Sequence, residues 1–149
     1  MTMDPDKLAR KICDAILLDD RATVALGVQV DDVKAGRVTL SMTVRPDMVN
    51  GHKICHGGVI FSLADSACAI ASNSRNQNMV LQTSTVTYLN PAQEGDRLIA
   101  VAEEQVIQGR NGVIDSTVTR NDGTLIALFR GVVRSISGHT LPEFAPMEN

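Results

Sequence analysis

The sequence predicts one α+β domain in which an antiparallel sheet of about six strands covers a single long helix. Two observations support this prediction. Several short segments alternate apolar and polar residues and are separated by glycine-containing turns, a pattern typical of antiparallel strands. Residues 57–73 instead repeat their apolar side chains at intervals of three and four, which indicates a helix.

The composition is that of an ordinary globular domain. A chain of 149 residues fits one domain, and we find no repeat or linker that would divide residues 1–149. The net charge of −3 argues against a general nucleic-acid binder, which needs basic groups to neutralise phosphates. One Tyr, three Phe and no Trp leave little material for stacking bases. We therefore expect no nucleic-acid partner.

The location of the chain is predicted from its first residues and its cysteines. The N-terminus is acidic and no apolar signal segment follows it. The most apolar stretch, residues 59–71, contains Asp65 and is too short to span a bilayer, so no membrane partner is expected. Three cysteines cannot all pair within one chain, and their spacing fits no disulfide framework. A reducing cytoplasm is the expected setting.

Residues 1–26 are predicted to form an N-terminal helical segment. Asp4 suits the N-cap of a helix and Pro5 suits its first position. The helix is expected to end near Asp19 and Asp20, and residues 22–26 to add another turn. Its apolar face is formed by Leu8, Ile12, Ala15 and Ile16.

Two strands are predicted before the long helix and four after it. Residues 28–31 and 38–44 alternate apolar and polar side chains around a turn at 34–36, and the polar residues 47–56 are predicted to form a loop. Glycine-containing joints between the later strands favour a consecutive antiparallel arrangement. The tail, residues 139–149, is expected to be loose. The later strands are predicted at residues 79–89, 97–108, 113–120 and 125–136.

Asp65 is the most informative residue because it lies in the middle of an almost entirely apolar helix. Burying a carboxylate is costly unless a partner compensates it. One interpretation is a structural acid that is hydrogen-bonded to the backbone, to Ser62 or Ser66, or to a neighbouring strand. The other is a catalytic carboxylate, since groups of this kind gather at functional sites.

Gly57 and Gly58 open the same helix and favour the catalytic interpretation. Glycines let a ligand approach the backbone, and free N–H groups at a helix N-terminus attract negative charge. Such donors suit the oxyanion that develops when a thioester carbonyl is attacked. A plain helix-entry turn is the alternative.

Helical geometry separates these two candidate groups within one chain. Gly57 and Asp65 are eight residues apart, so about 12 Å of helical rise lies between them. One chain cannot direct both groups at a single carbonyl. If two chains pack these helices antiparallel across a two-fold axis, Gly57 of one chain approaches Asp65 of the other, so the mechanism requires a homodimer.

Residues 50–65, NGHKICHGGVIFSLAD, resemble the signature of hotdog-fold acyl-CoA thioesterases, above all the phenylacetic-acid-degradation or PaaI-like branch. The resemblance extends to residues 88–92, 108–110 and 127–131, and it covers the chain from about residue 25 to residue 136. It implies a hotdog fold and hydrolysis of phenylacetyl-CoA or a ring-hydroxylated relative. It also implies a homotetramer, because tetramers are common among similar proteins. Coenzyme A would be part of the substrate, and no cofactor is expected.

The resemblance also implies roles for individual residues. Asp65 matches the acid that acts as nucleophile or general base, and Gly57 matches the backbone donor to the thioester oxygen. Asn50 matches a polar side chain that places the attacking water or the thioester, and His56 matches the imidazole before the helix. The candidate substrate-binding residues are Gly58 at the helix start, Arg110 for a coenzyme A phosphate, and Thr83 or Ser84 for a further hydroxyl.

Other interpretations of these residues have less support. His52, Cys55 and His56 lie close in sequence, but no second Cys or His cluster supplies the remaining ligands, so no metal is expected. Cys55 as a thiol nucleophile has no orienting third group. A hydratase or dehydratase of the same fold, and an acyl-CoA-binding sensor without catalysis, remain as alternatives.

Overall fold

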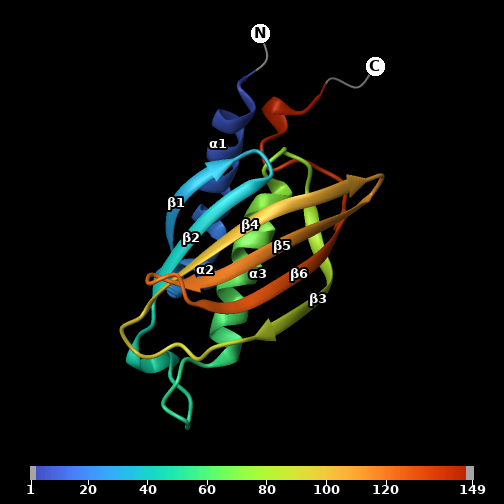
Figure 1. Cartoon of the computed structure of the whole chain (residues 1–149). Coiled ribbons are helices and arrows are strands. Elements are labelled where there is room, and N and C mark those ends of the chain that lie inside the picture. The colour runs from blue at the N-terminus through green and yellow to red at the C-terminus, as the bar shows by residue number, and fades with distance from the viewer. Residues whose placement is uncertain (1–2, 147–149) are drawn as a thin grey trace.

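A computed structural model describes residues 3–146 of the chain (Figure 1). Within these residues, three helices and six strands follow one another in the predicted order, with short 3-10 turns at Pro46–Met48 and Pro142–Phe144. The helices are α1 (Pro5–Asp19), α2 (Arg21–Ala25) and α3 (Gly57–Asn73). The strands are β1 (Gln29–Lys34), β2 (Arg37–Thr43), β3 (Met79–Tyr88), β4 (Arg97–Gln108), β5 (Asn111–Arg120) and β6 (Leu125–Ser135).

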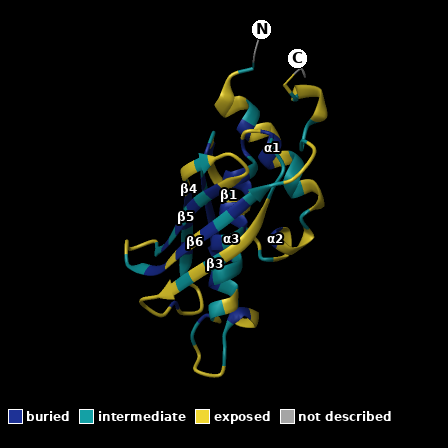
Figure 2. Cartoon of the chain, turned by 90° about the vertical axis from the view of Figure 1, so that its right-hand side faces the viewer, coloured by how far each residue is buried: buried dark blue, intermediate teal, exposed yellow. Residues whose placement is uncertain are grey.

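The six strands form one antiparallel sheet in the order β1-β2-β4-β5-β6-β3. The sheet curves around α3, which lies against its inner face (Figure 1). This arrangement confirms the predicted α+β class and the hotdog fold. The two edges of the sheet are β1 and β3, and most of β3 is exposed along its length (Figure 2).

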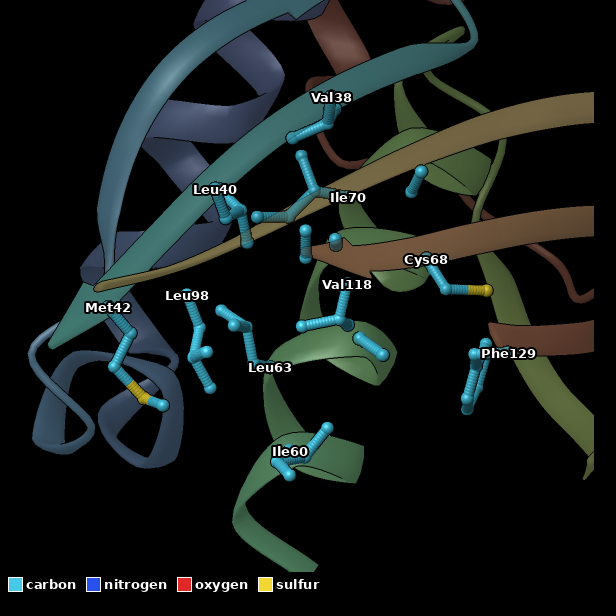
Figure 3. Packing of buried hydrophobic residues seen from close by; sticks show 14 of the residues in the cluster. Val38, Leu40, Met42, Ile60, Leu63, Cys68, Ile70, Leu98, Val118 and Phe129 are labelled. Carbon is cyan, nitrogen blue, oxygen red and sulfur yellow. The ribbon is translucent and has the colours of Figure 1, made fainter. Parts of the chain in front are cut away.

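The core lies between α3 and the concave face of the sheet. Leu63 and Ile70 of α3 are fully buried against the strands, together with Leu40 of β2 and Leu98 of β4 (Figure 3). Phe61 and Phe129 meet edge to face, with ring centroids 5.3 Å apart. Because nearly every face of α3 is apolar, the sheet can enclose this helix and hold both of its ends in place.

The N-terminal segment forms the predicted helix as α1, and the predicted further turn forms the short helix α2; α1 packs beside β1 and α3, and α2 packs beside α3. The carboxylate of Asp4 accepts hydrogen bonds from the backbone N–H groups of Asp6 and Lys7, both at 3.1 Å, which confirms its role as N-cap. Asp6 then accepts a hydrogen bond from Ala35 N–H at the β1–β2 turn, at 2.9 Å. This bond connects α1 to the sheet. No helix within residues 3–146 combines the length and apolar character needed to span a membrane.

The described part of the C-terminal tail is held against the loop between α3 and β3. Asn76 exchanges two hydrogen bonds with the backbone of Leu141, both at 2.8 Å. Its carbonyl oxygen lies 2.6 Å from Nδ1 of His139. The tail was expected to be loose over residues 139–149; His139 and Leu141 make these contacts, and residues 147–149 lie outside the described residues.

Candidate active site

His56 caps the N-terminus of α3 and leaves one backbone donor free. Its Nδ1 accepts a hydrogen bond from Gly58 N–H at 2.9 Å, and its carbonyl oxygen accepts from Val59 N–H at the same distance. A neutral imidazole that accepts at Nδ1 has its proton on Nε2. Among residues 3–146, Gly57 N–H has no hydrogen-bond acceptor. It is therefore the group at this helix end that can bind a negatively charged oxygen.

Tyr88 lies against Gly57 from the end of β3. Its hydroxyl donates a hydrogen bond to the carbonyl oxygen of Gly57 at 2.7 Å. A Cβ atom at position 57 would lie 3.1 Å from Cζ of the Tyr88 ring, which is tighter than most real contacts of that kind. The close approach of this ring explains why position 57 is glycine. No role was predicted for Tyr88 from the sequence, although it belongs to the segment 88–92 that resembles the thioesterases.

A cavity of about 490 Å³ opens beside Gly57. Asn50 lines it, and its Oδ1 accepts hydrogen bonds from His52 N–H at 2.9 Å and Ile54 N–H at 3.3 Å. The side chain thus folds the loop before α3 and also faces the cavity. The complete lining is Asn50, Ile54, Cys55, Gly57, Ile60, Tyr88, Leu89, Asn90 and Pro91, which is mostly apolar.

Asp65 is half-buried in the middle of α3. Ser62 donates its hydroxyl to Gly58 O at 2.8 Å, and Ser66 bonds to Thr23, so neither serine compensates the carboxylate. No described residue forms a hydrogen bond with that carboxylate. Burial, and then the negative charge of Asp20, raise the pKa of Asp65 above its ordinary value. The interpretation of Asp65 as a hydrogen-bonded structural acid is therefore not supported.

The structure keeps Gly57 and Asp65 apart within one chain, as helical geometry requires. Gly57 lines the cavity, whereas Asp65 lies two turns further along α3 and is not part of its lining. The predicted site residues Asn50, His56, Gly57 and Gly58 gather at the N-terminus of α3. Asp65 approaches none of them within the same protomer.

The remaining predicted residues lie elsewhere. Ser84 is half-buried on β3 opposite Gly131, whereas Thr83 is exposed beside an irregularity between Leu81 and Thr83. Arg110 is exposed in the β4–β5 hairpin, and its guanidinium donates to the carbonyl oxygen of Ser135 at 3.3 Å. Since Ser135 pairs with Met79 at the start of β3 and Tyr88 ends that strand, Arg110 lies far from Gly57 of its own chain.

The cysteine and metal alternatives gain no support from the geometry. Burial, and then the charge of Asp96, raise the pKa of the Cys55 thiol to about 11, so it is protonated at neutral pH. Within residues 3–146, no three His, Cys, Asp or Glu side chains gather closely enough to hold a metal ion.

Comparison with known proteins places this geometry in a family. The family model described as "Thioesterase superfamily" matches residues 52–127. The chain is 37% identical over 124 residues to the acyl-coenzyme A thioesterase PaaI of Escherichia coli (strain K12), covering 83% of this chain and 89% of that protein. The structure of the E. coli PaaI protein superposes with a TM-score of 0.90, 34% identity, and coverage of 91% of this chain and 99% of that one. The TT0310 protein of Thermus thermophilus superposes with a TM-score of 0.76 at 35% identity, covering 78% of this chain and 98% of that one.

These similarities define the class of the protein as a hotdog-fold thioester hydrolase. The chain belongs to the thioesterase superfamily and resembles its PaaI-type members over most of its length. The resemblance noted from residues 50–65 is thereby confirmed.

Proposed function

We propose that this protein hydrolyses an acyl-CoA thioester to a free acid and coenzyme A, with Gly57 and Asp65 as its catalytic groups. The observation that gives this proposal most support is that, within residues 3–146, α3 has both a free backbone donor and an unbonded carboxylate. Its first N–H group has no acceptor among the described residues, and its central carboxylate is half-buried without a hydrogen bond. The relatives named acyl-coenzyme A thioesterase and PaaI agree with this activity.

The reaction follows from these two groups. Gly57 N–H donates to the thioester oxygen, and the helix dipole helps to stabilise the negative charge that develops there. Asp65 either activates a water, whose oxygen adds to the carbonyl carbon, or attacks that carbon itself to form a mixed anhydride. In both routes the carbon–sulfur bond breaks and the coenzyme A thiolate leaves and takes up a proton. In the second route water then hydrolyses the anhydride.

A homodimer would bring the two groups together. β3 is an edge strand of ten residues, and its outer backbone groups are available for pairing with a second chain. Val80 and Leu81 on this edge are exposed by 45% and 36%, which is unusual for large apolar side chains unless a partner covers them. Antiparallel pairing of two β3 strands would also place the two α3 helices antiparallel. We expect such dimers to assemble into a homotetramer.

The same proposed dimer would give roles in the site to the other predicted residues. Arg110 lies near the start of β3, whereas Tyr88 lies at the end of that strand. In an antiparallel dimer, Arg110 of one chain would therefore lie near the Gly57 cavity of the partner chain. There its guanidinium suits a coenzyme A phosphate. Ser84 faces the α3 side of the sheet and is the better placed of the two hydroxyl candidates, whereas Thr83 is exposed. Asn50 contributes to the wall of the cavity, and His56 orients the helix start through its hydrogen bond with Gly58 N–H.

The lining of the cavity favours an aromatic or other apolar acyl group. Ile54, Ile60, Leu89 and Pro91 supply apolar walls, and the Tyr88 ring supplies a flat face. Phenylacetyl-CoA or hydroxyphenylacetyl-CoA is therefore the proposed substrate type. The E. coli relative comes from a phenylacetic acid degradation operon, which agrees with this choice. Coenzyme A belongs to the substrate, and the proposed mechanism needs no cofactor or metal.

Thiol release from a panel of acyl-CoAs tests this proposal. The panel spans phenylacetyl, hydroxyphenylacetyl, benzoyl, short-chain and long-chain thioesters and compares the wild type with Asp65→Asn. We expect hydrolysis by the wild type and a loss of at least about a hundredfold in the variant, equivalent to about 2.7 kcal/mol of transition-state stabilisation. A sensor would bind without turnover in both proteins. A hydratase would add water to an unsaturated acyl chain and release no thiol.

Mixed dimers test whether the site is shared between chains. Asp65→Asn removes the carboxylate of every site in a homodimer. Gly57→Ala keeps the backbone N–H but should displace it, because its Cβ would lie 3.1 Å from the Tyr88 ring. A mixed dimer keeps one site with both wild-type residues, because Gly57 of the first variant faces Asp65 of the second. Random mixing after unfolding and refolding should therefore restore about a quarter of wild-type activity. Refolded mixtures that stay as inactive as the separate variants would contradict a shared site.

A further inference from the structure

A buried chain of hydrogen bonds connects the N-terminal segment to the catalytic helix. The Thr23 hydroxyl lies 2.6 Å from Oδ2 of Asp20 and 2.8 Å from the hydroxyl of Ser66. Thr23 and Ser66 are only 3% and 9% exposed. The proposed mechanism uses none of these three polar groups, and Ser66 bonds to Thr23 and not to Asp65.

The direction of the bonds follows from the protons available. An ionised carboxylate can only accept, so the single hydroxyl proton of Thr23 points to Asp20. The bond between Thr23 and Ser66 must then use the Ser66 proton. Ser66 therefore donates to Thr23, and Thr23 donates to Asp20. All three residues are consequently fixed in orientation by one negative charge at the end of the chain.

Asp20 is held at the corner between α1 and α2. Its backbone N–H donates to Ile16 O at 3.1 Å and closes α1. Its Oδ1 accepts from Thr23 N–H at 3.0 Å and so opens α2. The side chain that fixes the corner is thus the same one that reaches α3 through Thr23. Ser66 directly follows Asp65 in α3, so the corner is hydrogen-bonded to the helix one residue away from the proposed catalytic carboxylate.

We propose that Asp20 is a positioning residue of the active site, which through Thr23 and Ser66 fixes the α1–α2 corner against α3 and places a negative charge beside Asp65. This inference rests on the proposed catalytic role of Asp65. A neighbouring negative charge makes the Asp65 carboxylate more basic, which strengthens it as a base or nucleophile but lets it be protonated at a higher pH.

The other charged groups around α3 are engaged with one another or lie at the surface. Cys68, one turn along α3, is a buried thiol whose pKa is raised to about 12, mainly by burial, and is uncharged at neutral pH. Arg21 of α2 and Lys7, Lys11 and Asp19 of α1 are exposed.

Many other charged side chains form ion pairs with one another. These pairs join Arg10 to Asp14, Arg37 to Glu103, Arg75 to Glu104, Arg97 to Asp31, Arg120 to Asp96 and Asp122, and Arg130 to Asp115. Asp20 is the charged group that acts on the pKa of Asp65.

Asp20→Asn is the most direct test, because the amide removes the charge and keeps the shape. Its oxygen can still accept from Thr23 N–H, and its NH2 group would donate to the Thr23 hydroxyl instead of accepting from it. We expect the acidic limb of the kcat/KM profile for acyl-CoA hydrolysis to move to lower pH, with KM almost unchanged. Thr23→Val should release the corner and lower kcat several-fold, and Thr23→Ser, which keeps the hydroxyl, should restore it. Asp32→Asn on β1 removes an equal charge from an exposed site and should leave the profile unchanged.

A readout without substrate separates this inference from the proposed activity. Titration of the Asp65 side-chain carboxyl by ¹³C NMR, assigned with Asp65→Asn, should give a lower pKa in Asp20→Asn than in the wild type. Equal Asp65 pKa values in the two proteins overturn the positioning role, even if thiol release is normal. A lowered pKa supports it, even if the panel of thioesters is not hydrolysed.

Discussion

The Tyr88 hydroxyl donates a hydrogen bond of 2.7 Å to the carbonyl oxygen of Gly57, the residue whose N–H is the proposed donor to the thioester. The bond joins the end of an edge strand to the first turn of the buried helix. Tyr88 therefore sets the position of the Gly57 peptide without contacting the reacting oxygen itself. Its ring also forms one wall of the cavity.

Tyr88→Phe removes this bond and keeps the ring. We expect kcat for acyl-CoA hydrolysis to fall several-fold while KM changes little. The apolar wall of the cavity remains, and only the orientation of the Gly57 N–H group becomes less well fixed. Steady-state kinetics on the best substrate of the panel measure the change. Thr87→Val alters the neighbouring exposed hydroxyl and serves as control. A Tyr88→Phe enzyme with wild-type kcat would show that the bond does not position Gly57.

Gly57→Ala should lower both stability and activity, because its Cβ would press on the Tyr88 ring at 3.1 Å. Gly51→Ala is the control in the loop that precedes α3, where an added Cβ meets no atom within 4 Å. Urea unfolding should give a lower midpoint for Gly57→Ala than for Gly51→Ala. The double variant Gly57→Ala/Tyr88→Ala should recover part of the stability lost by Gly57→Ala. Additive losses would show that the ring is not the cause.

The fold could be predicted because its local signals agree with its tertiary structure. The spacing of apolar residues identified α3 with its observed bounds, 57–73, and Asp4 and Pro5 identified the start of α1. The predicted strand order was wrong at one place, because the four later strands were expected to be consecutive in the sheet. β3 pairs with β6 at the far edge and not with the next strand in sequence, β4. That choice depends on how the sheet closes around α3, which no local pattern encodes.

The candidate site was predictable where it depends on helix geometry. Gly57, Gly58 and Asp65 share one helix, so their separation followed from residue number alone. The contacts of Tyr88 with Gly57 and of Thr23 with Ser66 join residues 31 and 43 positions apart. Such pairs are fixed by tertiary packing, and a single sequence contains no periodicity that indicates them.

The three cysteines should resist alkylation in the folded protein. All are buried, and burial is the main cause that raises the thiol pKa to about 11 for Cys13 and Cys55 and about 12 for Cys68. Almost no thiolate is then present at pH 8. Iodoacetamide at that pH should leave thioesterase activity intact, and intact-mass spectrometry should find adducts only in urea. Rapid modification of Cys55 with loss of activity would instead support Cys55 as the nucleophile.

Asp65→Asn should make the fold more stable at neutral pH. The pKa of Asp65 is raised in the folded protein, first by burial and then by Asp20, so folding opposes its ionisation. Stability is therefore lost as pH rises from the unfolded pKa of about 3.9 through the raised folded pKa, and the deficit persists above it. The variant carries no such charge. Urea unfolding should thus give it a higher midpoint than wild type at pH 7.

The same comparison at about pH 4 should show a smaller gain, because wild-type Asp65 is then largely protonated. Asp122→Asn is a control of opposite sign. The backbone N–H of Thr124, its hydroxyl and the Arg120 guanidinium lower the pKa of Asp122 to about 2, so its charge stabilises the fold at neutral pH and this is lost only as pH falls toward that value. Removing it should lower the midpoint at pH 7. If Asp65→Asn also lowers the midpoint at pH 7, the wild-type Asp65 carboxylate is stabilised by a partner group in the assembled protein. It is then not the unbonded base that the proposed mechanism requires.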